Sequence, residues 1–419
     1  MRKPAITKTE QPSRMSGVGI KIAVITLMLG QVILITAPCP VSAQQSYEAY
    51  YNYLGNDPKN ESTIWSQDAQ GVAHDRENWF ITQTLRLWKI PVNYDLASVS
   101  GNDAGVIVNE LNPPVSQFQD LLDDGYDHFG DLEWCEFEGQ GYLIVPVEGK
   151  DNPEVGAIAI FSADNLDYMH HDYLMDGKNF VQSRAAWCAV DPQGFVYSSG
   201  RDVGFINKYR IKWDSLKTKE RPWVEKVASI SLLSEDGSQV NITYLQGGAI
   251  SPSGELLYLV AGYHSGSDPS WGIHVFNLRT GRRVQRSQNG SGYFNYEFHP
   301  GLGILEAKKE EPEGLTIWNL NDFGELHVLM LNNDSPKYLS GVDEIYFKHY
   351  TGTIYVDHAY IFFLPSGTPG NPFKTVSEAN TLAWDGAQIK IAAGSYPEKL
   401  VFSKRIRIVA DKGPVIIGQ

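Results

Sequence analysis

Cysteine is scarce in this sequence, because the 419 residues contain three and only Cys135 and Cys188 lie beyond the first 43 residues. Two cysteines allow one disulfide and are far too few for a disulfide-stapled scaffold. Neither belongs to a C-x-x-C pair, and H-E-x-x-H is also missing, so the spacings typical of zinc sites are lacking. No G-x-S-x-G motif is present, which removes support for a serine hydrolase of the α/β-hydrolase type.

Basic residues are outnumbered by acidic ones, 35 to 49, which gives a net charge of −14. A protein of this charge repels nucleic acid and anionic surfaces, while cations and neutral sugars remain acceptable partners. Phosphate-binding and dinucleotide motifs are missing as well, and basic and aromatic residues do not alternate in a stripe. We therefore expect no nucleic-acid partner.

A long hydrophobic run is also lacking, since the uncharged stretch Ile22–Thr36 is shorter than the roughly 20 residues that span a bilayer. Five basic residues precede it, and Val41-Ser42-Ala43 offers the small residues that a signal peptidase reads. We predict that residues 1–43 are a signal peptide, with a membrane anchor as the alternative. Its removal leaves a charge of about −18 and predicts a secreted or periplasmic protein without membrane contact.

What the sequence does contain is an internal repeat. Five segments run from an apolar strand through a polar turn to a second apolar strand, and a third strand often follows. They begin at Gln70, Gly130, Arg184, Gln246 and Glu313. Sheets of this kind packed around an axis form a β-propeller. We predict an all-β fold with a five-bladed propeller over residues 44–350 and a sixth-blade candidate at Gly292–Ala307. Packed β-sandwiches are the alternative.

Three shorter stretches around the repeats have predicted roles. The segment Ser46–Gly55 reads as a closing or packing element, and Ser116–Asp127 reads as a short helix. The adjacent histidines His170 and His171 would point to opposite sides of an extended chain, so we expect a solvated loop there rather than a zinc site.

The pattern changes after His349, where a Gly/Pro-rich link leads to a helix signal at Thr375–Trp384 and to short strands. Tyr355-Val356-Asp357, Asn371–Val376 and Gly386–Glu398 resemble the N-terminal cap and first coils of pectate-lyase-like right-handed β-helix proteins. The resemblance implies a short β-helix-like module over residues 351–419. In that group the calcium-binding carboxylates and the catalytic base lie on later coils, so we expect no lyase chemistry from this segment.

Several segments of the propeller region carry a broader likeness. The sequences QGVAHD from Gln70, HFGDLE from His128 and EGLTIWNL from Glu313, together with the C-terminal segment, resemble bacterial secreted proteins that join a propeller-like region to a β-helix-like tail. The likeness implies fold and export and no particular activity.

The first strand of each blade in a propeller lines the central channel, which is the default place for a site. The blade starts therefore predict a ring of ligand-binding residues: Gln70, His128, Arg184 and Gln246. A hard cation such as calcium would bind carboxylate oxygens, and Asp131 and Glu313 are the candidates. The alternative is a purely structural ring, in which these polar side chains form hydrogen bonds to one another and to water in the channel.

Channel carboxylates also suggest catalysis, because two carboxylates in different environments divide the general acid and base roles. Asp75, Asp131 and Glu313 are the candidate catalytic residues, and five-bladed glycoside hydrolases use carboxylates in this way. Pro312–Leu315 also resembles the blade start of esterase-like and phytase-like propellers. We predict an extracellular binding module for a cation, a carbohydrate-like ligand or a cell-surface component. The alternative is a hydrolase of a sugar or phosphate ester.

The cysteines fit the repeat, because Trp134-Cys135 and Trp187-Cys188 occupy the same place in neighbouring units. This position indicates packing tryptophans and cysteines on adjacent inner strands. A catalytic thiol is disfavoured since no histidine motif accompanies either cysteine. A disulfide between the two blades remains open, because the sequence does not give the distance between the two Cα atoms.

Overall fold

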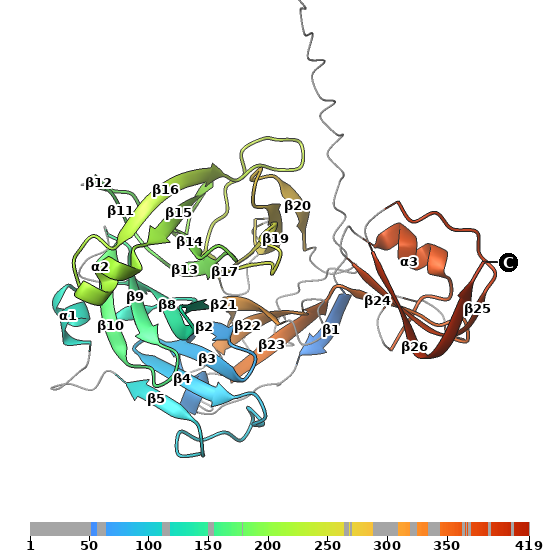
Figure 1. Ribbon diagram of the computed structural model, residues 1–419, viewed down its shortest axis with the longest axis horizontal. Helices are drawn as coiled ribbons and strands as arrows, with labels where there is room; N and C mark the ends of the chain where they lie inside the picture. Colours follow the sequence, from blue (N-terminus) through green and yellow to red (C-terminus); the bar gives the residue numbers. More distant parts are fainter. Residues whose placement is uncertain are drawn as a thin grey trace, which may run out of the picture. The chain divides into compact units, whose positions relative to one another are not determined.

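A computed structural model gives the fold of this chain (Figure 1). It describes residues 52–56, 64–110, 118–149, 155–177, 179–263, 268, 270–287, 309–318, 325–333, 344–362, 365, 367, 370–383, 387–403 and 406–418. The predicted signal peptide and the sixth-blade candidate at Gly292–Ala307 lie outside these residues. Within the described residues, no helix has the length and apolar character needed to cross a bilayer.

The chain forms a five-bladed β-propeller, as the repeat predicts (Figure 1). Blade I contains β2 (Ala69–His74), β3 (Asn78–Gln83), β4 (Arg86–Pro91) and β5 (Ile107–Glu110). Blade II contains β6 (His128–Phe129), β7 (Glu133–Phe137), β8 (Gln140–Glu148), β9 (Ala157–Ser162) and β10 (Tyr168–Tyr173). In both blades the strands pair antiparallel with their neighbours.

Blades III and IV repeat the same four-stranded order. Blade III contains β13 (Trp187–Val190), β14 (Phe195–Ser199), β15 (Phe205–Ile211) and β16 (Val224–Ser231). Blade IV contains β17 (Leu245–Ile250), β18 (Leu256–Ala261), β19 (Gly272–Asn277) and β20 (Arg283–Arg286). Inner strands such as β17 are buried along their whole length, whereas the outer strand β16 is mostly exposed or half-buried.

Blade V closes the ring with strands from both ends of the repeat region. It contains β21 (Lys309–Trp318), β22 (Glu325–Asn333), β23 (Glu344–Thr351) and the N-terminal strand β1 (Asn52–Asn56). The β1 strand pairs antiparallel with β23, across nearly 300 residues of sequence. The predicted closing element at Ser46–Gly55 is thus confirmed as a strand for the described part, and its hydrogen bonds hold the two ends of the propeller together.

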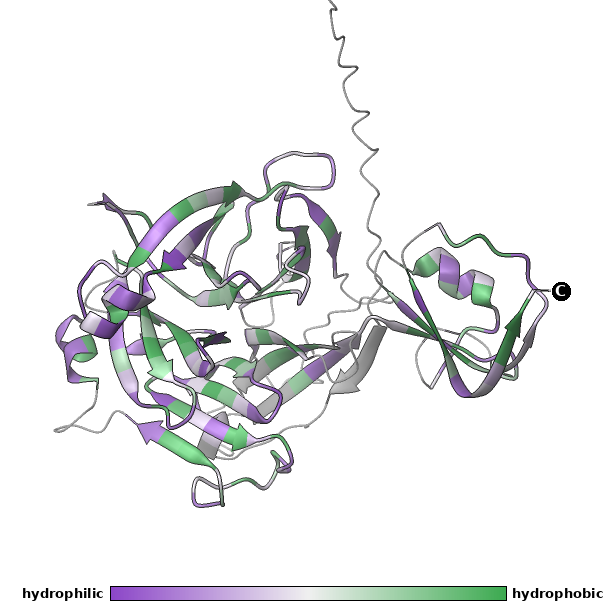
Figure 2. Ribbon diagram, in the orientation of Figure 1, coloured by the Kyte–Doolittle hydropathy of each residue, from purple (hydrophilic) through white to green (hydrophobic). Residues whose placement is uncertain are grey.

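Hydrophobic residues fill the seams between neighbouring blades, and Figure 2 shows them along the strands of the sheets. In the seam that closes the ring, Ile81 and Trp88 of blade I cluster with Leu329 and Phe347 of blade V. Burying side chains of this size contributes about 1.5 to 3 kcal/mol each. Because apolar residues face a neighbour on both sides of a blade, the inner strands read as apolar runs rather than alternating ones.

Shorter elements lie between the blades or, for the helix Trp213–Thr218, between two strands of blade III. These are η1 (Ile64–Ser66), α1 (Gln119–Asp123), β11 (Met175–Asp176), β12 (Asn179–Phe180) and α2 (Trp213–Thr218). The α1 helix confirms the short helix predicted in Ser116–Asp127. The solvated loop expected around His170 and His171 was wrong, because these residues belong to β10 and His171 is fully buried.

The C-terminal segment has parallel rather than antiparallel strands. The β24 strand (Thr353–Val356) pairs with β25 (Gln388–Tyr396), which pairs with β26 (Arg407–Ile417), and α3 (Val376–Leu382) precedes β25. The α3 helix confirms the predicted helix signal, and a capping box between Thr375 and Glu378 starts it. The likeness to a β-helix cap and the domain division at residue 350 stay predictions.

Candidate functional site

Three of the innermost strands carry a β-bulge at an equivalent position. The register shifts around Gln70 in β2, around Gln246 in β17 and around Glu313 in β21, and a glycine follows each of these residues. In blade II the innermost strand is interrupted between β6 and β7, at Gly130–Leu132. A bulge redirects its side chain relative to the regular pleat, and bulges are frequent beside binding sites.

The redirected side chains meet in one cavity of about 220 Å³, hereafter the channel cavity. All five blades contribute to its lining of Asp68, Gln70, His128, Gly130, Glu148, Ala186, Arg201, Gln246, Tyr263, Glu311 and Glu313. Four residues predicted from the blade starts are therefore brought together, namely Gln70, His128, Gln246 and Glu313. Their binding roles stay predictions.

Arg184 is the predicted ligand residue that does not line the channel cavity. Its side chain is 45% exposed, and Nη1 lies 3.7 Å from Oε2 of Glu148, which does line it. A pair this exposed contributes little to stability. Burial raises the pKa of Glu148, and the charge of Arg184 opposes that rise.

The blade-start pattern does not predict five of the lining residues, which are Asp68, Glu148, Arg201, Tyr263 and Glu311. The signal for two of them was available, because Asp68 and Glu311 each precede a predicted residue by two positions in an extended chain. Glu148 ends β8 and Arg201 follows β14, so nothing in the blade-start pattern marks them.

Hydrogen bonds order part of the cavity wall. Nε2 of His128 lies 2.7 Å from Oε1 of Gln70, and Nε2 of Gln246 donates to Oε1 of Glu311 at 2.5 Å. Since the amide oxygen of Gln70 only accepts, the proton of this bond is on Nε2 of His128. Burial raises the pKa of Glu311 to about 7, against the opposing effects of Arg201 and of the bond from Gln246. Burial therefore favours the protonated form of Glu311.

Two buried polar atoms of the lining residues have no hydrogen-bond partner within the described part of the chain. They are Oε1 of Glu148 and Nε of Arg201. Burial raises the pKa of Glu148, and the charges of Arg184 and Arg201 oppose the rise. An unpaired buried donor or acceptor costs about 1 to 3 kcal/mol, so the two atoms together favour a bound molecule that supplies a donor and an acceptor.

Aromatic rings hold Arg201 in place. Its guanidinium carbon lies 5.1 Å from the ring centre of Tyr244, which stacks on Tyr263 at 4.9 Å and 12°. Tyr244 has a φ of 53°, a left-handed conformation that is rare for a bulky residue. Its N–H donates to Oδ1 of Asp202, and its carbonyl accepts from the N–H of Gly262. Such imposed conformations cluster at ligand sites.

Asp131 lies at the centre of the blades and has no exposed surface. Its carboxylate accepts backbone N–H groups from three other blades: Val72 at 3.0 Å, Gly248 at 3.0 Å and Leu315 at 3.3 Å. Its own backbone pairs with blade III, donating to Ala186 and accepting from Cys188. Asp131 thus bonds to every other blade.

This position bears on the roles predicted for Asp131 as a catalytic group and a calcium ligand. Burial raises its pKa well above the ordinary range, and the three N–H donors oppose that rise. A substrate or cation would reach the carboxylate only by displacing the backbone of inner strands. The geometry instead indicates a structural role, in which the hydrogen bonds of Asp131 hold the five blades together.

Glu133 begins β7 two residues after Asp131, and its Oε1 accepts the N–H of Trp134 at 3.0 Å. Burial raises the pKa of Glu133 to about 8. Burial therefore favours the neutral form of this carboxyl in the folded protein.

The wild-type protein is expected to lose unfolding free energy as the pH becomes alkaline, and the Glu133→Gln variant is expected not to show this loss. A pKa raised from 4.5 to about 8 contributes stability that is fully present below pH 4.5 and is lost as the pH rises through 8. Because Glu133 keeps some exposed surface, we expect a loss of roughly 2 kcal/mol from pH 5 to 9 in the wild type, measured by urea unfolding. Glu136→Gln, exposed on the same strand, should follow the wild type, and an unchanged slope in Glu133→Gln would refute the assignment.

Asp75, the third catalytic candidate, closes the hairpin between β2 and β3. Its Oδ1 accepts the N–H groups of Glu77 at 2.9 Å and Asn78 at 2.7 Å. Asp191 bonds its own turn in the same way in blade III, where Oδ1 accepts from Gln193 and Phe195. Asp75 does not line the channel cavity, and its contacts are those of a turn residue.

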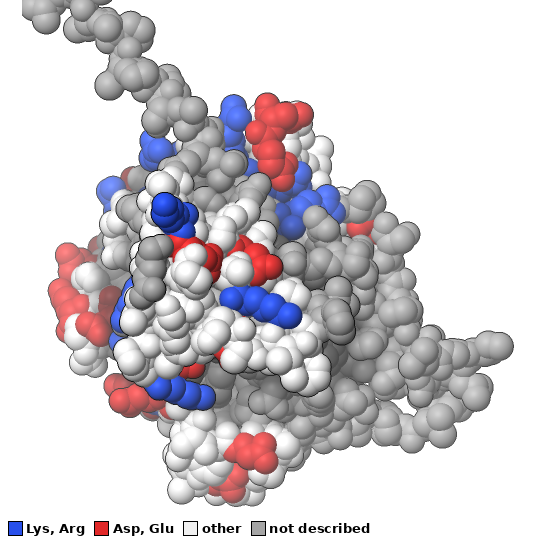
Figure 3. All heavy atoms as spheres, turned by 90° about the vertical axis from the view of Figure 1, so that its right-hand side faces the viewer, with Lys and Arg blue, Asp and Glu red and all other residues white. Residues whose placement is uncertain are grey.

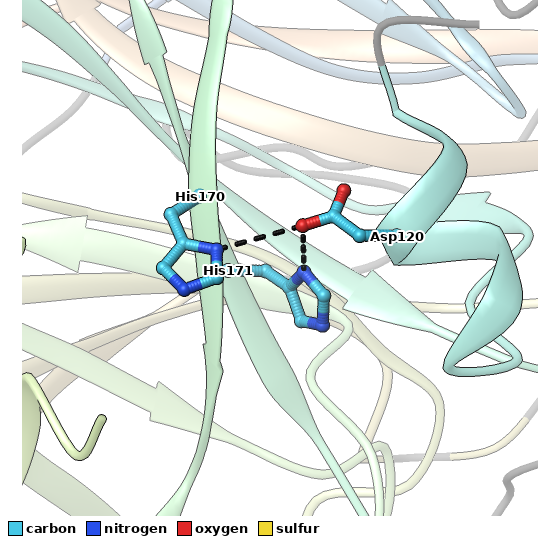
Figure 4. Close-up of side chains that lie close together, drawn as sticks. All are labelled: Asp120, His170 and His171. Atoms are coloured by element: carbon cyan, nitrogen blue, oxygen red, sulfur yellow. Dashed lines mark ion pairs between the residues drawn. The ribbon is translucent and has the colours of Figure 1, made fainter. Parts of the chain in front are cut away.

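Potential metal ligands gather in blade II and not in the channel cavity. Among the described residues, three such side chains come within 4.8 Å of one another only at Asp120, His170 and His171 (Figure 4). Within the described residues, Glu313 and the other carboxyl groups of the channel cavity do not form a group of three potential metal ligands. The calcium site at Asp131 and Glu313 stays a prediction without a gathered ligand set.

Both described cysteines are free thiols, on the adjacent inner strands β7 and β13 as predicted. Cys188 is fully buried, and its Sγ donates to the carbonyl of Ile144 at 3.1 Å. Burial raises the pKa of Cys135 to about 12 and that of Cys188 well above its ordinary value. Thiols in this state are poor nucleophiles.

Comparison with known proteins gives a likeness in structure only. No family model and no curated protein sequence matches the chain. Similar solved structures include the RS223 β-xylosidase, with 10% identity over 70% of this chain and 94% of that one and a TM-score of 0.39. A GH43 endo-arabinanase from Bacillus licheniformis has 13% identity over 71% and 97% and a TM-score of 0.38. The Dos1 propeller has 12% identity over 68% of both chains and a TM-score of 0.33. Likenesses of this size do not bear on activity, and the five blades rest on the strand pairing itself.

Proposed function

We propose that the protein binds a small, neutral, polyhydroxylated ligand of sugar type in the channel cavity. The observation that carries the proposal is the pair of buried atoms without partners, Oε1 of Glu148 and Nε of Arg201. A sugar hydroxyl is both donor and acceptor, so one ring with two hydroxyls would satisfy both atoms.

Charge and size support this class of ligand. Four carboxyl groups line the cavity against one arginine, at Asp68, Glu148, Glu311 and Glu313, so an anion would find little positive charge there. On the face shown in Figure 3, Lys and Arg side chains lie among Asp and Glu side chains. The volume of about 220 Å³ is below the roughly 300 to 1,000 Å³ of pockets for drug-sized ligands, which suits a single sugar unit.

Export fits the same proposal. The predicted signal peptide at residues 1–43 would place the protein in the periplasm or outside the cell, where free and surface-bound carbohydrate is the partner we propose. The C-terminal strands β24, β25 and β26 would then be a β-helix-like module attached to the binding propeller.

A hydrolase is the second candidate, and Glu311 favours it. A carboxyl with a pKa of about 7 is suited to act as a general acid at neutral pH. Most glycoside hydrolases use a second carboxylate on the other side of the scissile bond. Glu148 and Glu313 line the same cavity and are the candidates for this second group. In this reading Glu313 keeps its predicted catalytic role, while Glu311 takes the place of Asp131.

Binding of monosaccharides and short oligosaccharides, followed by calorimetry and ligand-observed NMR, tests the proposal. Glu148→Leu and Arg201→Met are expected to weaken binding at least tenfold, because each removes a hydrogen-bonding group and leaves a ligand hydroxyl unpaired in a buried site. Glu136→Gln, on the exposed face of β7, should bind as the wild type does. In the hydrolase case Glu311→Gln would keep binding and lose turnover of aryl glycosides. Failure of the whole saccharide panel to bind, or binding by Glu148→Leu and Arg201→Met as tight as that of the wild type, would overturn the proposal.

A further inference from the structure

We propose that Asp120, His170 and His171 form a binding site for a transition-metal ion of the zinc type on blade II. The site is separate from the channel cavity and does not depend on the function proposed for it. Three side chains of types that bind zinc converge there from two elements, α1 and β10.

The convergence follows from where β10 lies in its sheet. It is the edge strand of blade II, and its register shifts between Tyr168 and His170. Neighbouring residues of a strand point to opposite faces, but at an open edge both rings can turn toward the same helix. Figure 4 shows the two Nδ1 atoms directed at one carboxylate oxygen of Asp120, with β10 on one side and α1 on the other.

The distances suit a single ion. Oδ2 of Asp120 lies 3.5 Å from Nδ1 of His170 and 3.8 Å from Nδ1 of His171. Ligand atoms about 2.0 to 2.2 Å from a tetrahedrally bound zinc lie roughly 3.4 Å apart. The two oxygen-to-nitrogen distances are close to this spacing, and all three ligand atoms lie within 4.8 Å of one another. Access is open, because the side chains of Asp120 and His170 are 50% and 15% exposed.

A second carboxylate orients the buried histidine. Oδ2 of Asp124 lies 2.8 Å from Nε2 of His171, and it also accepts from the hydroxyl of Tyr173 at 2.9 Å. When Nε2–H donates to Asp124, the lone pair of Nδ1 points toward Asp120. Zinc-binding histidines have this arrangement, in which the second ring nitrogen donates to a carboxylate.

Two neighbouring groups compete with the ion. Nη2 of Arg221 lies 2.7 Å from Nε2 of His171, and as a donor it favours the ring proton on Nδ1. The hydroxyl of Tyr168 lies 2.6 Å from Nδ1 and 3.1 Å from Oδ2 of Asp120. An ion bound to Nδ1 of His171 would favour the tautomer in which Nε2–H donates to Asp124. It would also replace the hydrogen bonds that the Tyr168 hydroxyl makes to His171 and Asp120. The freed hydroxyl oxygen of Tyr168 is then the candidate for the fourth ligand of the ion.

The local charge favours a cation. Asp120, Asp123, Asp124 and Asp127 lie within ten residues around α1, and Arg221 contacts Asp124 at 3.3 Å. A bound ion would also tie α1 to β10 and so cover the open edge of blade II, where unpaired backbone groups invite association with another strand.

Zinc titration of the full chain, without a histidine tag and in competition with a chromophoric chelator, tests this site. We expect one equivalent to bind to the wild type, and cobalt to give the absorption of a tetrahedral site with nitrogen and oxygen ligands. His170→Ala and Asp120→Asn are expected to weaken binding at least 100-fold, because each removes a ligand. Asp124→Asn is expected to weaken it 10- to 100-fold, because it only releases the orientation of His171.

Two control variants separate this site from other sources of affinity. His358→Ala removes an exposed histidine of the C-terminal segment, and His128→Ala removes one of the channel cavity. Both should bind zinc as the wild type does, with melting curves confirming that each variant is folded. No binding to the wild type, equal affinity in His170→Ala and Asp120→Asn, or a sulfur-to-cobalt charge-transfer band that implicates Cys135 would each reject the proposal.

Discussion

The Asp131→Ala variant is expected to lose about 4 kcal/mol or more of unfolding free energy, a large part of the 5 to 15 kcal/mol typical of a folded domain. The substitution removes the acceptor of the N–H groups of Val72, Gly248 and Leu315. Each buried N–H left without a partner costs about 1 to 3 kcal/mol. Because the three donors belong to three blades, the variant loosens several seams at once.

Urea unfolding, monitored by tryptophan fluorescence, measures this loss of unfolding free energy. Asp75→Ala is the matched control, since it also removes a carboxylate that accepts backbone N–H groups, but within one exposed hairpin. It should cost about 1 kcal/mol. Asp131→Asn should fall between the two, because its amide keeps one acceptor oxygen and turns an NH₂ group toward backbone donors. A midpoint for Asp131→Ala equal to that of the wild type would show that the carboxylate does not hold the blades.

The fold was largely predictable because each blade repeats the same local pattern. Two apolar runs with a Gly, Pro or Asp turn between them specify a hairpin wherever they occur, and they recur from Gln70 to Glu313. The pairing of β1 with β23 was less visible, since it joins residues at opposite ends of the repeat region. The expectation of a closing segment was nevertheless right.

The candidate site was predictable only where it follows the repeat. Gln70, Gln246 and Glu313 occupy equivalent positions before a glycine, so their convergence could be foreseen. Glu148 and Arg201 sit at strand ends that the repeat does not mark, and the bonds of Asp131 join residues 59, 117 and 184 positions apart. Contacts at such separations arise from the closure of the ring and not from any local pattern.

The arrangement of the adjacent histidines could not be predicted from the sequence for a different reason. Opposite faces are the correct rule for a strand inside a sheet, and His170 and His171 do leave β10 on different faces. What the rule lacks is the position of the strand, because an edge is open and a helix such as α1 can meet both rings there. Strand order within a sheet is a tertiary property, so the zinc-type cluster could not be predicted from the sequence.

The Gly314→Ala variant is expected to fold poorly or to lose more than about 3 kcal/mol of unfolding free energy. A Cβ added at Gly314 would lie 2.3 Å from Oδ1 of Asp131 and 2.9 Å from Cα of Gly71. Neither atom can move away, because Asp131 is held by backbone donors and Gly71 belongs to the inner strand of blade I. The cost comes from lack of space between the blades at their closest approach.

Gly200→Ala is the matched control, because a Cβ added at Gly200 meets nothing within 4 Å. It should change the unfolding free energy by no more than about 0.5 kcal/mol, measured with Gly314→Ala by thermal and urea unfolding. Melting of Gly314→Ala at the wild-type temperature would mean that the inner strands have room to separate. In that case Asp131 would not be enclosed, and its predicted role as a ligand of a channel cation would regain its physical basis.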